Sequence, residues 1–228
     1  MVFGDFIIKS KADLRAAIRE FGFLPFFENS IGGFSIEEHI APQCWWNSET
    51  GAWSAWEWKG PVIRETGCAY GKFFEKKAAF VSREVFLDLA NYRRNGYDFD
   101  SRFDEGLARR ADRELYSLVE EHGPVLSRRL KGLGYYGKDG RKDFDPCMLR
   151  LQEQCYVVIS DFVYELDKHG KPYGWGVAEY ATAERQQGPE FRRQVYRCDP
   201  AESYARLLER LKALNPNTEE KTLKRFLK

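Results

Sequence analysis

The sequence predicts an α+β fold of winged-helix type, in which helices are combined with small antiparallel hairpins. In several segments apolar residues recur every three or four positions after a capping residue, which is typical of amphipathic helices. Within residues 150–182, two β-prone runs flank the short polar sequence DKHGKP, as in a β-hairpin. Three helices followed by such a hairpin have the order of elements of a winged helix.

The first predicted helix begins at Ser10, which forms a capping box with Asp13, and it ends at Gly22. Its apolar face consists of Leu14, Ala17, Ile18 and Phe21. A second box at Ser35 and Glu38 predicts another helix start.

Residues 25–67 are otherwise predicted to be irregular, although they contain five of the six tryptophans. Residues 68–82 alternate loosely between apolar and polar positions, which favours one or two short strands. Ser82 can cap the helix that follows, and Arg93 and Arg94 lie near the negative end of its dipole.

Three further helices are predicted before the hairpin. The first ends at Gly123 and Pro124, and its apolar stripe consists of Leu107, Ala111, Leu115 and Leu118. A shorter helix follows in residues 124–134, and the third has Asp145 as its cap and Pro146 in its first position.

The elements suggest three regions along the chain. Residues 1–100 form an amino-terminal helical and Trp-rich region with a short β element. Residues 101–184 form a winged-helix-like unit, and residues 185–228 form carboxy-terminal helices. The longest of these helices begins at Asp199 and Pro200 and is followed by a short one after Thr218.

Composition excludes several classes of protein. The 36 Lys and Arg nearly balance the 35 Asp and Glu, so affinity for a polyanion must come from local clustering of charge. No apolar run is long enough to span a bilayer and no leader peptide is recognisable, which predicts a cytoplasmic location without membrane contact. Five Cys without a C-x-x-C pair favour reduced thiols, and no metal or cofactor is expected.

Positive charge is concentrated where a winged helix meets DNA. Between residues 128 and 142 there are six basic residues and one acidic residue, and the hairpin loop adds two lysines. The predicted DNA-binding residues are Arg128, Arg129, Lys138, Arg141, Lys142, Arg150, Lys168 and Lys171. Contact with the phosphate backbone is favoured over base readout, because the third helix contains few residues that recognise bases. A solvated surface without a ligand is the alternative.

The Trp-rich segment and its neighbours are candidates for other chemistry. Trp45, Trp46, Trp56 and Trp58 are candidates for stacking on an unpaired or damaged base, with a role in the core as the alternative. Glu57, between two tryptophans, is a candidate catalytic carboxylate. Asp98, Asp100, Asp104 and Glu105 are interpreted as a turn before a helix rather than as a metal site.

Residues 69–94 read AYGKFFEKKAAFVSREVFLDLANYRR. This segment resembles part of the AlkZ/YcaQ-type bacterial DNA glycosylases. Residues 91–119 and 164–184 are similar to shorter chains called AlkZ-related. The resemblance implies tandem winged-helix domains and double-stranded, damaged DNA as the ligand, because the glycosylases excise alkylated bases or unhook crosslinks.

The sequence departs from the glycosylases at their functional motifs. It has no amino-terminal Q-Φ-D or Q-Φ-Q motif, and its one Q-x-Q is Gln152-Glu153-Gln154. At the position of the family's W-x-H motif this sequence has Phe74-Glu75-Lys76, so both the Trp and the His are replaced. We therefore expect a DNA-binding relative of the repair glycosylases without that motif. The alternatives are a glycosylase with relocated catalytic residues and a regulatory domain that binds protein; the oligomeric state is open.

Overall fold

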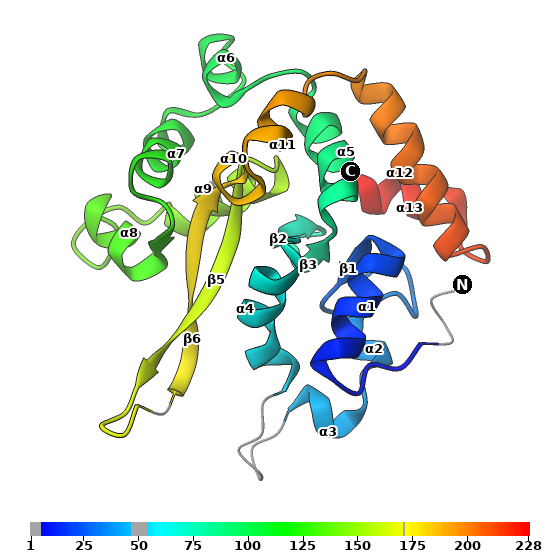
Figure 1. Cartoon of the computed structure of the whole chain (residues 1–228). Helices are drawn as coiled ribbons and strands as arrows, with labels where there is room; N and C mark the ends of the chain where they lie inside the picture. The colour runs from blue at the N-terminus through cyan, green and yellow to red at the C-terminus, as the bar shows by residue number, and fades with distance from the viewer. Residues whose placement is uncertain (1–5, 47–53, 171) are drawn as a thin grey trace.

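The structure is a computed structural model that describes residues 6–46, 54–170 and 172–228. It combines helices with two antiparallel sheets of three strands each (Figure 1). The predicted class, a mixed α and β fold with small antiparallel sheets, is therefore confirmed. None of the described helices is long and apolar enough to cross a membrane.

The first sheet belongs to a set of elements that we call the first arrangement. Its elements are α1 (Lys11–Phe21), β1 (Phe23–Pro25), α2 (Ile36–His39), α3 (Pro42–Trp45), α4 (Ala55–Thr66), β2 (Ala69–Phe74) and β3 (Lys77–Val81). The strand order is β1-β3-β2, with Val81 facing both Phe23 and Ala69. The last strand in sequence therefore lies in the middle of the sheet.

The second sheet repeats this plan in the second arrangement. Its elements are α7 (Arg110–His122), β4 (Val125–Leu126), α8 (Ser127–Leu133), α9 (Phe144–Glu153), β5 (Val157–Leu166) and β6 (Pro172–Thr182). The strand order is β4-β6-β5, so the last strand again lies in the middle. Both arrangements thus share the order helix, strand, helix, helix and two-stranded hairpin, and α3 is extra in the first.

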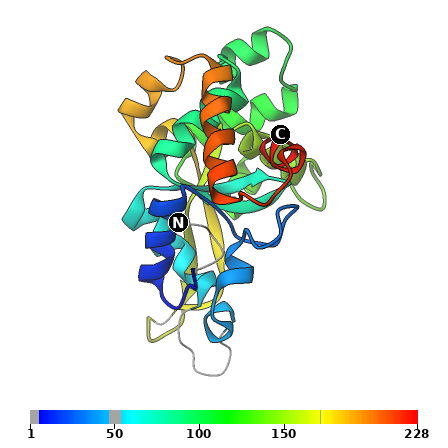
Figure 2. The same cartoon turned by 90° about the vertical axis from the view of Figure 1, so that its right-hand side faces the viewer.

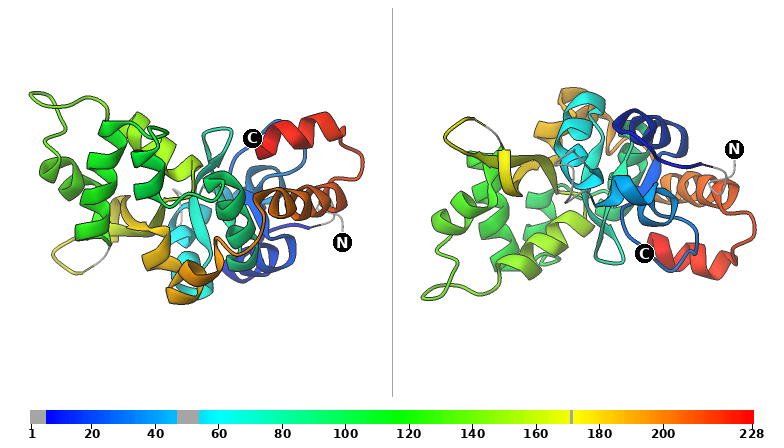
Figure 3. Two further views of the ribbon diagram at one scale, coloured as in Figure 1. Left: turned by 90° about the horizontal axis from the view of Figure 1, so that it is seen from above. Right: turned by 90° about the horizontal axis from the view of Figure 1, so that it is seen from below.

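The remaining helices connect and cover these two arrangements. They are α5 (Arg83–Arg94), α6 (Phe99–Asp104), α10 (Ala183–Gln187), α11 (Pro189–Gln194), α12 (Pro200–Leu214) and α13 (Glu220–Leu227). Helix α12 packs against α5, and in α13 the ring of Phe226 stacks on Phe74 at 4.6 Å between centroids. Helices α12 and α13 lie beside the first arrangement, at the end of the molecule away from α7 and α8 (Figures 2 and 3).

The two arrangements pack against each other through equivalent elements. Helix α4 contacts β5, α9 contacts β2, and the two strands contact each other. In α9 the buried Gln152 accepts a hydrogen bond of 3.0 Å from the backbone N–H of Lys72 in β2. In α4 a Cβ atom on Gly60 would lie 2.5 Å from Oδ1 of Asp161, so the close approach to β5 requires glycine.

Several element boundaries differ from those predicted. Helix α4 replaces a segment that was predicted to be irregular, and α7 starts at Arg110, which leaves Leu107 51% exposed before it. Helix α9 starts at Phe144 after Asp143, two residues earlier than the Asp145 cap predicts. The first hairpin strand begins only at Val157, because α9 extends to Glu153 and a turn at residues 154–156 follows it.

Candidate nucleic-acid interface

Strands β5 and β6 form a long hairpin that projects from the body of the molecule (Figure 1). Its base is buried, with Val157 and Val158 in β5 inaccessible to solvent. Toward the tip the large apolar side chains are open to solvent: Leu166 is 61% exposed, Tyr173 56% and Trp175 66%. A monomeric soluble protein rarely exposes neighbouring large apolar side chains without a binding role, so this outer half is a candidate contact surface.

Trp175 on the hairpin meets tryptophans of the first arrangement. Its ring centroid lies 5.3 Å from that of Trp46 and 6.0 Å from that of Trp56. Trp45 completes the group at 5.6 Å from Trp56. We call these four residues the Trp cluster. Because Trp46 is 52% exposed beside the exposed Trp175, the cluster offers aromatic faces to a ligand where the two arrangements meet.

The other two candidates in the Trp-rich segment have structural partners. Trp58 is 8% exposed and belongs to the main core, so it does not join the Trp cluster. Glu57 completes a capping box at the start of α4, where Oε2 accepts hydrogen bonds from the backbone N–H of Ser54 at 2.7 Å and from its hydroxyl at 2.5 Å. Capping explains this carboxylate without a catalytic role.

Four of the predicted DNA-binding cations remain available for a ligand. Arg129, Lys138 and Lys168 are exposed and form no ion pair within the described part of the chain. Lys142 is also exposed, and its Nζ donates to the backbone carbonyls of Gly137, at 2.5 Å, and Lys138. These cations lie on α8, on the loop after it and at the hairpin tip. Lys171 lies outside the described residues.

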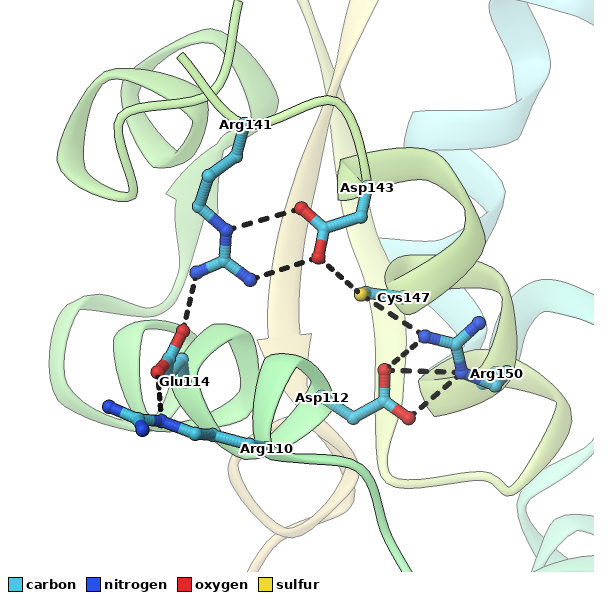
Figure 4. Close-up of polar contacts among 7 residues, drawn as sticks. All are labelled: Arg110, Asp112, Glu114, Arg141, Asp143, Cys147 and Arg150. Atoms are coloured by element: carbon cyan, nitrogen blue, oxygen red, sulfur yellow. Dashed lines mark hydrogen bonds and ion pairs between the residues drawn. The ribbon is translucent and has the colours of Figure 1, made fainter.

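Two further predicted cations are paired with carboxylates. Arg128 in α8 forms an ion pair with Glu165 in β5, which links α8 to the hairpin. Arg141 binds both oxygens of Asp143, at 3.2 and 3.0 Å, and also Glu114 at 2.6 Å (Figure 4). The hydrogen bond with Asp143 raises the pKa of Arg141 and lowers that of Asp143. Arg141 therefore holds the loop before α9 against α7.

Arg150 in α9 is paired within the same network. Its Nε and Nη2 atoms bind both oxygens of Asp112 in α7, at 2.5 to 3.1 Å, and Nη2 also contacts Sγ of Cys147 (Figure 4). The Asp112 side chain is only 5% exposed, and its hydrogen bond raises the pKa of Arg150. Arg150 thus joins two helices of the second arrangement instead of pointing to solvent.

The face that α9 leaves to solvent is poor in groups that recognise DNA. Asp145 and Pro146 are exposed and Leu149 is half-buried. The two polar residues best suited to read bases, Arg150 and Gln152, are bound to Asp112 and to the backbone of β2. This face therefore lacks the arginine, lysine and amide side chains that most often read bases in the major groove.

A profile of the family described as AlkZ related matches residues 8–228, which is nearly the whole chain. The chain belongs to the AlkZ-related family. This confirms the resemblance, which covers most of residues 21–184, and suggests a relation to the DNA repair glycosylases. No curated protein and no solved structure matches the sequence.

The AlkZ-related chain also has a cavity, which lies at the opposite end of the molecule from the hairpin tip (Figure 1). This cavity of about 580 Å³ lies among α6, α7, α10 and α11. Four carboxylates and two arginines line it: Asp98, Asp100, Glu120, Glu184, Arg185 and Arg192. Two of these carboxylates pair with further arginines, so the lining carries both signs of charge and does not single this cavity out as a phosphate site.

Two of the acidic residues that we interpreted as a turn, Asp98 and Asp100, have structural partners beside this cavity. Asp98 caps α6 by accepting a hydrogen bond of 2.8 Å from the backbone N–H of Ser101, and Asp100 pairs with Arg113. Glu184 binds the fully buried Arg94 at 2.5 Å. Helix α6 was interpreted as a turn, although its Asp98 cap is a local signal, and the Arg94–Glu184 pair was not predicted because it joins residues 90 positions apart.

Trp175 is the functional candidate of the AlkZ-related chain that sequence reasoning missed. It lies apart from the Trp-rich segment, within a run that reads PYGWGVAEY. Alternation along β6 offered one signal, because Tyr173 and Trp175 share a strand face beyond the buried base of the hairpin. The meeting of Trp175 with Trp46, 129 positions earlier in the sequence, required the fold.

Proposed function

We propose that this AlkZ-related protein binds DNA and that both arrangements are winged helices, the second one covering residues 101–184. The order of helices and strands and the order of strands in both sheets support this. The observation that carries the proposal is the projecting hairpin, whose exposed Trp175 joins Trp46 and Trp56 of the first arrangement. Aromatic faces of this kind stack on bases or insert between base steps.

The contact with DNA is made by the hairpin and not by α9. In a winged helix the third helix enters the major groove, but here α4 and α9 are both engaged in packing the two arrangements together. The hairpin tip is free, with Lys168 exposed beside Leu166 and Tyr173. Arg129, Lys138, Lys142, Lys168 and Lys171 are our proposed phosphate contacts, whereas Arg128, Arg141 and Arg150 stabilise the fold.

A binding titration with duplex DNA and with DNA that contains an unpaired base tests this proposal. We expect Trp175→Ala to weaken binding by about 5- to 150-fold, since stacking of one base is worth roughly 1–3 kcal/mol. Leu107→Ala is the matched control, because Leu107 is also large, apolar and 51% exposed but lies far from the hairpin. Equal affinities of the wild type and Trp175→Ala would contradict the role of the Trp cluster.

Charge at the tip supplies a second readout. Replacing Lys168 and Lys171 together by Glu should weaken binding to every sequence and should reduce the dependence of affinity on salt by about one unit of slope per lost phosphate contact. Arg141→Gln should leave the salt dependence unchanged, since Arg141 is bound to Asp143 and Glu114. If Arg141→Gln reduces the salt dependence and the double lysine variant does not, the loop before α9 and not the hairpin tip contacts the phosphate backbone.

The enzyme alternative is a DNA glycosylase with relocated catalytic residues, and family membership favours it over a protein-binding regulatory domain. The glycosylase motif is not carried over to Gln152-Glu153-Gln154, because the Gln152 side chain is buried and bound to Lys72 and Met148. Incubation with alkylated or crosslinked DNA, followed by an assay for abasic sites, separates an enzyme from a binding protein.

A further inference from the structure

Lys59 in α4 holds its amine among aromatic rings. Its Nζ lies 4.3 Å from the ring centroid of Phe162 in β5, 4.6 Å from that of Trp56 and 5.5 Å from that of Phe26. The residue is 8% exposed and forms no ion pair or hydrogen bond within the described part of the chain. A lysine without an anionic partner is uncommon at this degree of burial.

Relative to an exposed lysine, burial shifts the protonation equilibrium of Lys59 toward the neutral amine, although the facing rings favour the ammonium. Burial lowers the pKa of Lys59 from 10.5 to about 8, and the carboxylate of Glu57 opposes this only partly. The other charged groups nearby bind each other, since Arg64 pairs with Asp161 across the joint of α4 and β5. At pH 7 roughly a tenth of such a lysine is a free amine, against about one part in three thousand for an ordinary lysine.

We propose that Lys59 is a nucleophilic amine that forms a Schiff base with an aldehyde, and that its substrate is the ring-opened deoxyribose of an abasic site in DNA. This rests on the proposed DNA binding. The amine lone pair attacks C1′ of the sugar, and a proton moves from nitrogen to oxygen to give a carbinolamine. Loss of water then leaves a C=N bond between Nζ and C1′, without any oxidant or metal.

The position of Lys59 relative to the Trp cluster suits an abasic site. Its amine lies against the Trp56 ring, and Trp56 in turn contacts the exposed Trp46 and Trp175. A flanking base can stack on the exposed tryptophans while the lesion itself faces the cage. An abasic nucleotide has no base to accommodate, so its sugar needs less room beside Lys59 than a nucleotide that retains its base.

Borohydride trapping tests this inference on the intact protein. The wild type is incubated with an oligonucleotide duplex that contains one abasic site, sodium cyanoborohydride is added, and the covalent complex is mapped by mass spectrometry. We expect a crosslink at Lys59 that is lost at least tenfold in Lys59→Arg, which keeps the cation over the rings but not the amine. Lys221→Arg is the control, because Lys221 is exposed in α13, outside the proposed interface, and should leave the crosslink unchanged.

Affinity for the same duplex, measured in parallel without reductant, separates this inference from the proposed function. Full binding without a crosslink, or a crosslink that persists in Lys59→Arg, overturns the role of Lys59 alone. Absence of binding and of crosslink overturns DNA binding together with it. A reaction with propanal and cyanoborohydride tests whether a free small aldehyde reacts with Lys59 in place of the abasic sugar. If propanal labels Lys59 while the abasic duplex binds without being trapped, the amine reacts with small aldehydes and the abasic-site proposal is contradicted.

Discussion

The two arrangements share one topology but use their hairpins differently. In the first, the strands of the β2–β3 hairpin are mostly buried and are joined by a tight turn at Glu75 and Lys76, both at positive φ. In the second, the β5–β6 hairpin is buried only at its base and projects far into solvent. One hairpin therefore serves packing and the other is free to bind a ligand.

The means of stabilisation also differ. The first arrangement is held by aromatic rings, such as the Tyr70–Phe80 pair at 4.6 Å and the Phe26 ring beside it. The second has a smaller core and a buried charge pair, Arg150 with Asp112, whereas the ion pairs that Glu65 forms in the first arrangement lie at the surface. This difference explains why positive charge in the second arrangement cannot be equated with DNA contact, since part of it replaces apolar packing.

The largest expected effect concerns this buried charge pair. Asp112→Ala should destabilise the protein by about 3–5 kcal/mol, because it leaves Arg150 without its partner in a largely buried place. The free energy of unfolding in urea measures the loss. Replacing both residues, Asp112→Leu with Arg150→Met, should recover much of it. If Asp112→Ala alone costs little, the pair does not stabilise the second arrangement and its charges are free for other roles.

A pH series compares the buried amine of the first arrangement with an exposed one. Because burial lowers the pKa of Lys59 to about 8, the unfolded chain binds a proton between pH 8 and 10.5 that the folded chain does not. Wild-type stability should therefore rise relative to Lys59→Met across this window, by on the order of 2 kcal/mol, and the difference should be constant below pH 8.

Urea unfolding at pH 7.5 and pH 10 measures this rise. Lys72→Met, which removes an exposed lysine of β2, is the matched control. Parallel pH curves for the wild type and Lys59→Met would mean that Lys59 titrates as an ordinary lysine and that the cage does not exclude solvent.

A smaller effect tests the contact between the arrangements. Gly60→Ala should cost about 1–2 kcal/mol, since the new methyl group would displace the Asp161 carboxylate and crowd the backbone of Phe162. Gly132→Ala in α8 is the matched control, because open space surrounds it and helix propensity should give a gain of up to about 1 kcal/mol. Equal gains in both variants would show that α4 does not pack closely on β5.

The sequence predicts those elements that carry local signals. The helix capped by Ser10 and closed by Gly22, the helix capped by Ser82 and the helix that begins at Pro200 lie where capping and periodicity indicate. Helix α4 was missed because Gly60 and Pro61 interrupt its middle, although Ser54 and Glu57 form the same kind of box as elsewhere. Glycine is required there by a neighbouring strand that is about a hundred residues away in the sequence.

The candidate site was less accessible to sequence reasoning. The sequence indicates Trp45, Trp46 and Trp56 as stacking candidates because they lie in a Trp-rich segment. Trp58 lies in the same segment but is buried in the core. The sequence shows where basic residues are concentrated, but it does not show that Arg150 binds Asp112, 38 positions earlier. Pairing and burial depend on which distant segments meet, and local patterns do not contain this information.

Hydrogen exchange with and without bound duplex DNA tests the central claim most directly, because it reports on hairpin and helix in one experiment. Our account predicts slower exchange over the outer halves of β5 and β6 and over α3, with α9 unchanged. Slower exchange over α9 with an unchanged hairpin would contradict it, since the groove would then be read by a helix that we place between the two arrangements.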